Sequence, residues 1–377
     1  MKQLSLKNLN WGPSLFLIAY QLFAVIFAPY YLFTHSVSWS LISLTILFYL
    51  LGGLAITAGY HRLYSHRAYK VGRIFESILL FFGSSTMQGS AIRWSYDHRM
   101  HHGHVDTDKD PYSITRGFWY AHCLWILERP QKIDKKVVSD LYQNPLVRFQ
   151  HRFSKLAMFG SNVVLFLLSW AITGNALGSF VLAVCVRLFF IHHCTWFINS
   201  LAHTWGDQPF SQEHTAVNNY VISLLTFGEG YHNFHHTYAN DYRNGVRWYQ
   251  FDPTKWLIWG CSKLGLAWAL RRTDNQAIDL RIFQETKQEF YERLQGLWDE
   301  KKVEFEEALQ SISERIESKL KKLSYLKREY TRLKQERSPR SELKSIKREL
   351  KRVKKSLRDE WRRWSELKLD FMKLQPA

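Results

Sequence analysis

The chain has few cysteines and no recognisable flavin or nicotinamide fingerprint. Its 377 residues include only four cysteines, and none of these forms a Cys-x-x-Cys pair. This absence argues against a disulfide framework and against a cysteine-based zinc site. Electrons for any redox reaction would therefore come from another protein. No nucleic-acid partner is expected.

Long apolar runs fill the first part of the chain and indicate a multi-pass membrane protein. Four runs reach the length of about 20 residues that is needed to cross a bilayer. They are residues 12–33, 38–60, 155–174 and 177–200. The links within each pair of runs contain no Lys or Arg, whereas the residues after the second run are rich in both, which places both termini in the cytosol. The shorter apolar stretch 74–92 is expected to form a helix tucked against the membrane.

The C-terminal part has a different pattern. Apolar residues recur at alternating spacings of three and four from Leu309 to Leu333, with Lys319 as one polar member, and again from Leu343 to Phe371. A Pro-containing break separates the two stretches, so the pattern predicts an antiparallel coiled-coil hairpin. Its simplest role is a solvated structural or self-associating arm. Docking to a partner or to anionic lipid headgroups is the alternative.

These patterns predict an all-α fold with two domains. Residues 1–272 would form a membrane domain, a four-helix transmembrane bundle with a cytosolic helical cap. Residues 273–377 would form the cytosolic coiled-coil hairpin, which could support a homo-oligomer.

Eight histidines fall into three short segments. These segments are HRLYSH (61–66), HRMHH (98–102) and HNFHH (232–236). In the last two, the spacing i, i+3 and i+4 places three imidazoles on one face of a helix turn. Imidazole suits iron, zinc, copper and nickel, so the residues alone do not name the metal. Eight or more ligands exceed the four of a closed zinc site, and two metal ions are therefore predicted.

Together with the spans before and between them, these segments resemble the membrane fatty acyl desaturase family, specifically its Δ9 acyl-CoA (stearoyl-CoA) type. The resemblance covers about residues 12–272. It is carried by the sequences ITAGYHRLYSHRAYK, WSYDHRMHH, TWFINSLAHTWG and GEGYHNFHHTYANDYR. The C-terminal arm is not part of it, and the chain has no His-Pro-Gly-Gly segment of a fused cytochrome b5 domain.

The resemblance implies a di-iron centre with nine histidine ligands. The first iron would be held by His61, His66, His98, His102 and His235. The second would be held by His101, His203, His232 and His236, with Asn199 reaching it through a water.

The resemblance also implies the reaction. Iron, O2 and two electrons would introduce a cis double bond, at the Δ9 position, into a saturated long-chain acyl-CoA. Cytochrome b5, or a ferredoxin with its reductase, would supply the electrons. Hydroxylases share such histidine segments, so hydroxylation is an alternative, as is desaturation of lipid-linked acyl chains. A non-enzymatic metal carrier ranks far lower, because the spans show no ladder of acidic or histidine residues.

A kinked substrate tunnel is a further implication of the resemblance. Gln88, Trp94, Thr195 and Trp196 match family positions around its bend. The family asparagine beside Gln88 is replaced here by Gly89.

The ends of the tunnel are less closely matched. Arg129 matches a family arginine at the mouth, but Pro130 replaces the lysine that often follows it. Tyr49 and Gly53 lie on a face of the second span where residue size could set the chain length, although helix packing is the default role of a small residue. The absence of a fused electron donor favours a bacterial inner membrane over the endoplasmic reticulum.

Overall fold

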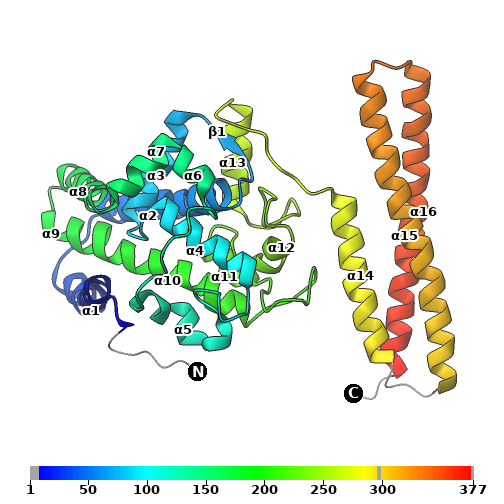
Figure 1. Ribbon diagram of the computed structural model, residues 1–377, viewed down its shortest axis with the longest axis horizontal. Coiled ribbons are helices and arrows are strands. Elements are labelled where there is room, and N and C mark those ends of the chain that lie inside the picture. The colour runs from blue at the N-terminus through cyan, green and yellow to red at the C-terminus, as the bar shows by residue number, and fades with distance from the viewer. Residues whose placement is uncertain (1–7, 295–298, 375–377) are drawn as a thin grey trace. The chain divides into compact units, whose positions relative to one another are not determined.

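The computed structural model describes residues 8–294 and 299–374, which divide into two compact units (Figure 1). The membrane unit lies within Met1–Gln208 and Glu213–Arg272, and the C-terminal unit within Pro209–Gln212 and Thr273–Ala377. Both units are helical, which confirms the expected all-α fold class.

Four helical segments are long and apolar enough to cross a membrane, as the sequence predicts. They are Trp11–Thr34 (α1), Trp39–Ser65 (α2, Trp39–Leu54, continued by the π-helix η2, Ala55–Ser65), Ser154–Thr173 (α8), and Ala176–His203 (α9, Ala176–Gly178; η5, Ser179–Val186; α10, Arg187–Ser200; η6, Leu201–His203).

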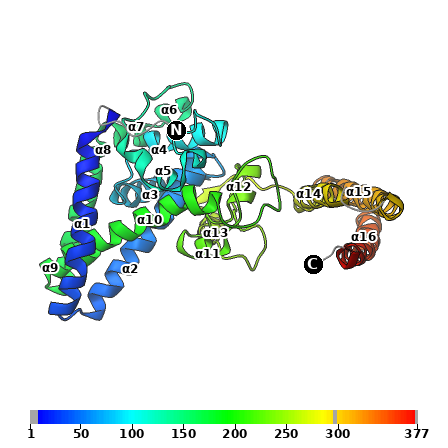
Figure 2. The ribbon, with the colours of Figure 1, turned by 90° about the horizontal axis from the view of Figure 1, so that it is seen from below.

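The fourth span is the central one. Its η5 segment contacts α1, α2 and α8 (Figure 2). The outer faces of the spans expose large apolar side chains, such as Phe33 (91% exposed) and Leu156 (71%). An apolar surface of this kind is suited to lipid rather than water.

The links between paired spans are tight. Gly174 ends α8 with a φ of 66°, a left-handed conformation that glycine adopts without steric cost. The Asn175 side-chain oxygen then accepts a hydrogen bond from the Gly178 N–H (2.8 Å) and caps the next helix. The chain therefore reverses direction in a few residues, and α8 and α9–α10 become neighbours.

The stretch 74–92 forms two elements rather than the single helix expected. The first, α3 (Arg73–Ser85), is not long enough to count as a span. A turn follows in which Met87 and Gly89 both have positive φ, and α4 (Ala91–His104) begins after it. This turn presents Gln88 to the interior of the unit, where the site lies.

Short elements complete the helical cap. They are β1 (Lys70–Val71), η3 (Ile114–Arg116), α5 (Phe118–His122), η4 (Leu124–Leu127), α6 (Ser139–Gln143), α7 (Pro145–Arg152), α11 (Tyr220–Leu225), α12 (His232–Thr237), α13 (Pro253–Lys263) and β2 (Ala267–Trp268), with β1 and β2 paired antiparallel.

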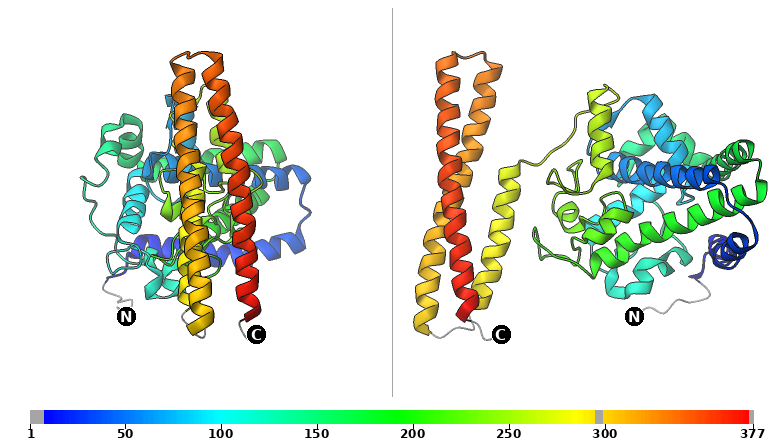
Figure 3. Two further views of the ribbon diagram at one scale, coloured as in Figure 1. Left: turned by 90° about the vertical axis from the view of Figure 1, so that its right-hand side faces the viewer. Right: turned by 180° about the vertical axis from the view of Figure 1, so that it is seen from behind.

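The described residues of the C-terminal unit form three helices, one more than the predicted hairpin. α15 (Asp299–Gln335) and α16 (Arg340–Leu374) form the hairpin, and α14 (Asn275–Leu294) packs on α15 (Figure 3). Phe283 and Phe290 of α14 are buried in the core of the unit. The apolar repeat in the sequence begins at Leu309, so it does not predict this helix.

One predicted position in the hairpin is wrong. Leu320, 2% exposed, is the buried residue of the apolar face, whereas Lys319 lies beside it. The Lys319 ammonium binds the Glu360 carboxylate of α16 at 2.6 Å. The other predicted apolar positions that are buried in this core include Ile316 and Leu323.

Candidate metal centre

The first histidine segment depends on an unusual helix. His61 and His66 are five residues apart, which in an α-helix would turn them away from each other by about 140°. The segment is π-helical instead, and the His66 N–H donates to the His61 carbonyl at 3.1 Å, an i→i+5 bond. This wider winding brings residues five apart onto one face. The two rings consequently meet, with centroids 4.8 Å apart.

The other segments use ordinary helical spacing. α4 presents three histidines at i, i+3 and i+4, and α12 presents three more in the same way. His203 comes from η6, at the end of the fourth span. Four elements that are distant in sequence therefore contribute to one region of the membrane unit.

The nine histidines form two groups. Within each group the candidate ligand atoms all lie within 4.8 Å of one another. The first group is His61, His66, His98, His102 and His235, and the second is His101, His203, His232 and His236. This is the division that the resemblance implies, and the role of these residues as ligands remains a prediction.

The orientation of the rings fits a cation in the first group. The His61 Nδ1 faces the Glu229 carboxylate at 2.7 Å, and a carboxylate only accepts hydrogen bonds. The ring hydrogen therefore sits on Nδ1, and the Nε2 lone pair points into the group. That Nε2 lies 2.9 Å from the Nε2 of His235, which in turn lies 2.9 Å from the Nε2 of His102. Nitrogen lone pairs that converge in this way repel one another. A positive ion bound among them would turn this repulsion into attraction.

The second group has the same construction. The His101 Nδ1 faces the Asp110 carboxylate at 2.9 Å, and its Nε2 is 3.3 Å from the Nε2 of His236. The His203 Nδ1 bonds the Thr215 hydroxyl at 2.8 Å, while its Nε2 lies 3.1 Å from that of His232. The donor set therefore fits a metal ion here as well.

The protonation state of the rings also suits metal binding. Burial, reinforced by repulsion from neighbouring histidines, holds the pKa of His98, His102 and His235 well below the usual histidine range. These rings are neutral at pH 7, and neutral imidazole is the form that coordinates metals.

Two supporting carboxylates were missed by the sequence analysis. Glu229 also binds the guanidinium of Arg62 at 2.9 Å, and Arg62, 1% exposed, binds Asp252 at 3.0 Å. Glu229 stands three residues before His232, a Glu-x-x-His spacing that could have drawn attention to it. Asp110 carries no comparable signal, because its contact with His101 is made only in the fold.

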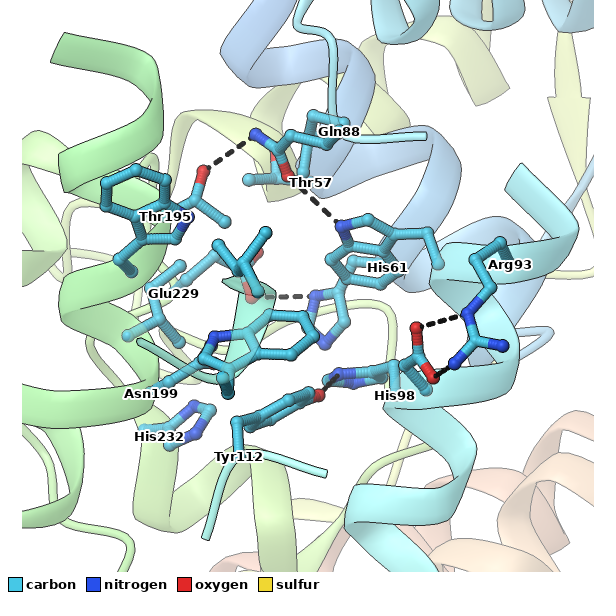
Figure 4. Close-up of a pocket in the computed structure, with 17 residues that line it drawn as sticks. Thr57, His61, Gln88, Arg93, His98, Tyr112, Thr195, Asn199, Glu229 and His232 are labelled. Atoms are coloured by element: carbon cyan, nitrogen blue, oxygen red, sulfur yellow. Dashed lines mark hydrogen bonds and ion pairs between the residues drawn. The ribbon is translucent and has the colours of Figure 1, made fainter. Parts of the chain in front are cut away.

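A cavity adjoins both histidine groups. His61 and His98 of the first group and His232 of the second line it, together with apolar side chains (Figure 4). Four residues predicted for the tunnel bend also line it: Gln88, Trp94, Thr195 and Trp196.

Gln88 is hydrogen-bonded to two other residues that line this cavity. Its amide nitrogen donates to the Thr195 hydroxyl at 3.0 Å, and its amide oxygen accepts from the Trp94 indole at 3.1 Å (Figure 4). Asn199 and Arg93 are also in the lining, and Arg93 is a cation that sequence reasoning did not select. The water-mediated role of Asn199 stays a prediction.

A second cavity continues the first. The two share five lining residues, Ile56, Thr57, Gln88, Thr195 and Ile198. Tyr49 and Gly53 line the second cavity, as does Phe227. A Cβ atom on Gly53 would lie 2.0 Å from the Phe227 ring. The Phe227 side chain therefore fills the space beside Gly53 and leaves no room for a larger residue.

Arg129 lies apart from the two cavities in the described part of the chain. Its side chain is exposed, its N–H donates to the Asn8 carbonyl at 2.8 Å, and its Nε approaches the Leu9 carbonyl at 3.4 Å. These contacts attach the segment before α1 to the cap. The assignment of Arg129 to the tunnel mouth remains a prediction.

Comparison with known proteins assigns the family. Residues 36–271 match the model of the fatty acid desaturase family, which is more than half of the chain. The chain therefore belongs to this family, as its sequence segments suggest.

Individual relatives carry more specific names. The "Probable acyl-CoA desaturase" of Schizosaccharomyces pombe is 42% identical over 290 residues, 76% of this chain and 60% of that protein. "Acyl-CoA desaturase 1" of Saccharomyces cerevisiae is 40% identical over 244 residues, 64% of this chain and 48% of that protein. The "sn-2 palmitoyl-lipid 9-desaturase" of a Nostoc species is 37% identical over 238 residues, 61% of this chain and 81% of that protein. The chain thus spans about half to three fifths of the length of the two yeast relatives.

Proposed function

We propose that the chain is a di-iron acyl-CoA Δ9 desaturase that introduces a cis double bond into saturated long-chain acyl groups. The observation that carries this proposal is the shared cavity. His61 and His232, one from each histidine group, line the same apolar space. An acyl chain in that space would lie beside both groups.

The balance of the reaction defines what the site must do. Two adjacent carbon atoms of the acyl chain each lose one hydrogen atom, and the single bond between them becomes a double bond. Two further electrons and two protons complete the reduction of O2 to two water molecules. Two iron ions, held by the nine histidines, would activate O2 as the oxidant, a chemistry that side chains alone cannot supply.

The protein itself would position the chain and exclude water. The Gln88 amide, fixed between Thr195 and Trp94, narrows the passage where the two cavities join. A bent passage selects one conformation of the bound chain, and holding one bond near the reacting atoms is a large part of catalysis. The apolar walls keep solvent from the reacting atoms.

The headgroup and the electron donor are parts of the same proposal. The names of the two yeast relatives support a CoA thioester, whereas the name of the Nostoc relative supports the lipid-linked alternative. A cytochrome b5, or a ferredoxin with its reductase, would deliver the electrons. Self-association through the coiled coil has no support from the structure, because the apolar faces of α15 and α16 pack within one chain.

The location is proposed from the spans and the relatives. Four candidate spans make this a membrane protein. With four spans, both ends and all nine histidines would lie on one side, and the distribution of Lys and Arg supports the cytosolic side. The yeast relatives favour the endoplasmic reticulum over the bacterial inner membrane expected from the sequence.

Fatty-acid analysis of cells expressing the protein tests this function. The wild type should produce new cis-monounsaturated chains, and His235→Ala should produce none. His104→Ala is the matched control, because His104 lies on α4 but in neither group. Hydroxylated chains would instead establish the hydroxylase alternative.

The purified protein then separates the two headgroups. With an electron donor, it would be given saturated acyl-CoA or a phospholipid with the same acyl chain. Conversion of the CoA thioester alone supports the proposal, and conversion of the phospholipid alone would overturn the CoA assignment.

A further inference from the structure

The last helix is far more basic than the rest of its unit. Of the 35 residues of α16, thirteen are Lys or Arg and six are Asp or Glu. α15 has ten basic and eight acidic residues, and α14 has three basic and four acidic residues. The positive charge of the C-terminal unit is therefore concentrated on one helix.

These charges form a stripe along α16. Successive members are separated by four and three residues in turn, and all are exposed. We call this set the basic stripe: Lys344, Arg348, Lys351, Lys355, Arg358 and Arg362. It extends for roughly 27 Å, since a helix rises 1.5 Å per residue.

The basic stripe lies opposite the buried face of the helix. Ile346, Leu350, Val353, Leu357 and Trp364 belong to that face, and each stands two positions after a member of the stripe. A displacement of two residues turns a side chain through about 200° on a helix. The stripe is thus a direct consequence of the packing that holds α16 on α15.

The acidic groups of α16 do not neutralise the stripe. Glu360 is bound by Arg315 and Lys319 of α15, and Glu349 is bound by Lys322 of α15. Within the described part of the chain, none of the six stripe residues has an ion-pair partner. α15 thus binds two of the six acidic residues of α16, and in the described residues the other four form no ion pair with the stripe.

The stripe suits a flat anionic surface. Between Lys344 and Arg362, α16 exposes no large apolar side chain, so the contact would be electrostatic and would not insert into lipid. The C-terminal unit follows the last candidate span in the chain, so the proposed topology would put it on the cytosolic side of the membrane. The cytosolic leaflet carries anionic lipids, and each basic residue near such a surface contributes to attraction. Attachment to the same membrane also makes that surface locally abundant.

We propose that the basic stripe of α16 binds the anionic phospholipid headgroups of the membrane in which the chain is embedded. This binding does not depend on the desaturase reaction. It gives the arm a role in holding the C-terminal unit at the membrane surface, and the contact should weaken with salt.

Lysine acetylation of the full-length protein in lipid nanodiscs tests the proposal. The discs contain phosphatidylcholine alone or with added phosphatidylserine, and mass spectrometry follows the modification of each lysine. Acetylation of Lys351 and Lys355 should slow by about fivefold or more in the anionic discs at low salt, because a bound ammonium is shielded. Lys321 and Lys334, exposed on α15, are internal controls and should change little. High salt should abolish the difference.

Matched variants separate the stripe from total charge. Lys351→Gln, Lys355→Gln and Arg358→Gln together should release Lys344, the remaining lysine of the stripe, to fast acetylation in the anionic discs. Lys321→Gln, Arg328→Gln and Lys334→Gln remove the same charge from α15 and should not. Gln is a good helix former, and all six positions are exposed, so both variants should fold.

Three results would overturn the proposal. Equal acetylation in the two kinds of disc excludes recognition of lipid charge. Equal protection in both points to contact within the protein. Protection that appears only when an acidic soluble protein is added would assign the stripe to a protein partner.

Discussion

His102 of the first histidine group and His236 of the second stack with ring centroids 4.2 Å apart and 15° between their planes. These two rings are half-buried, whereas the other seven histidines are buried. The two groups therefore meet at the most open edge of the site. A substitution in this stack should disturb both groups, so tests of their independence need residues elsewhere.

Metal content should fall by half when one group is broken. His235→Ala removes a central nitrogen of the first group and His232→Ala one of the second. Each purified variant should retain about one metal ion where the wild type has two, because each set is a separate cage. Elemental analysis measures this directly. Loss of both ions from each variant, or of neither, would contradict the division into two sites, and His104→Ala should keep both.

Asp110→Asn should weaken metal binding at the second group alone. The carboxylate accepts from the His101 Nδ1 at 2.9 Å and so fixes the hydrogen on that atom. Partners of this kind typically change metal affinity by about 10–100-fold. Competition with a chelator would show one ion lost at lower chelator concentration and the other unchanged. Identical behaviour of both ions would argue against a local role for Asp110.

Residues that line the second cavity but not the first should control chain length. Tyr49→Ala enlarges the second cavity and should favour longer products. Gly53→Ala should favour shorter ones, because the new Cβ would lie 2.0 Å from the Phe227 ring and force it to move. One methylene in an apolar pocket changes selectivity by roughly tenfold or more.

The ratio of product chain lengths from a mixture of saturated substrates measures this effect. Leu47→Ala is the control, since Leu47 is on the same helix and 45% exposed. An equal shift in the control would mean that the product ratio reports general damage to α2.

The C-terminal unit should respond differently to two adjacent substitutions. Leu320→Ala empties a buried position and should cost about 2–5 kcal/mol of unfolding free energy. Lys319→Ala leaves Glu360 paired with Arg315 and should cost less than about 1 kcal/mol. Amide hydrogen exchange of α15 and α16 in the full-length protein would resolve the two. If Lys319→Ala lowered the unfolding free energy more than Leu320→Ala, the assignment of Lys319 to the seam would be correct after all.

The contrast between Leu320 and Lys319 shows where pattern analysis fails. A strict heptad places Lys319 in the seam, and the repeat resumes in register at Leu323 and Leu326. Leu320 is buried because α14 also packs on α15, beside Glu317 and Ser324, and this widens the buried face of α15 beyond the seam. The periodicity therefore predicts the helix and most of its seam, but not the extra buried position that a third helix creates.

The membrane unit follows the same logic. The spans were predictable because lipid demands about 20 apolar residues, and the histidine segments because their density is rare. Glu229 and Asp110 were not, since each meets its histidine only after distant elements pack. Gln88 was selected through family resemblance, and its two hydrogen bonds depend on a turn with positive φ that sequence spacing does not reveal.

The π-helix at Ala55–Ser65 has a consequence for insertions and deletions. A π-turn closes with an i→i+5 hydrogen bond and so contains one residue more than an α-turn. The extra residue widens the turn, and the helix on either side keeps its position. Removing one of the four residues between His61 and His66 would leave an i, i+4 pair, which an ordinary α-helix also presents on one face. The ligand pair should therefore tolerate a one-residue change in length that would scramble most sites, provided the segment changes its winding to match.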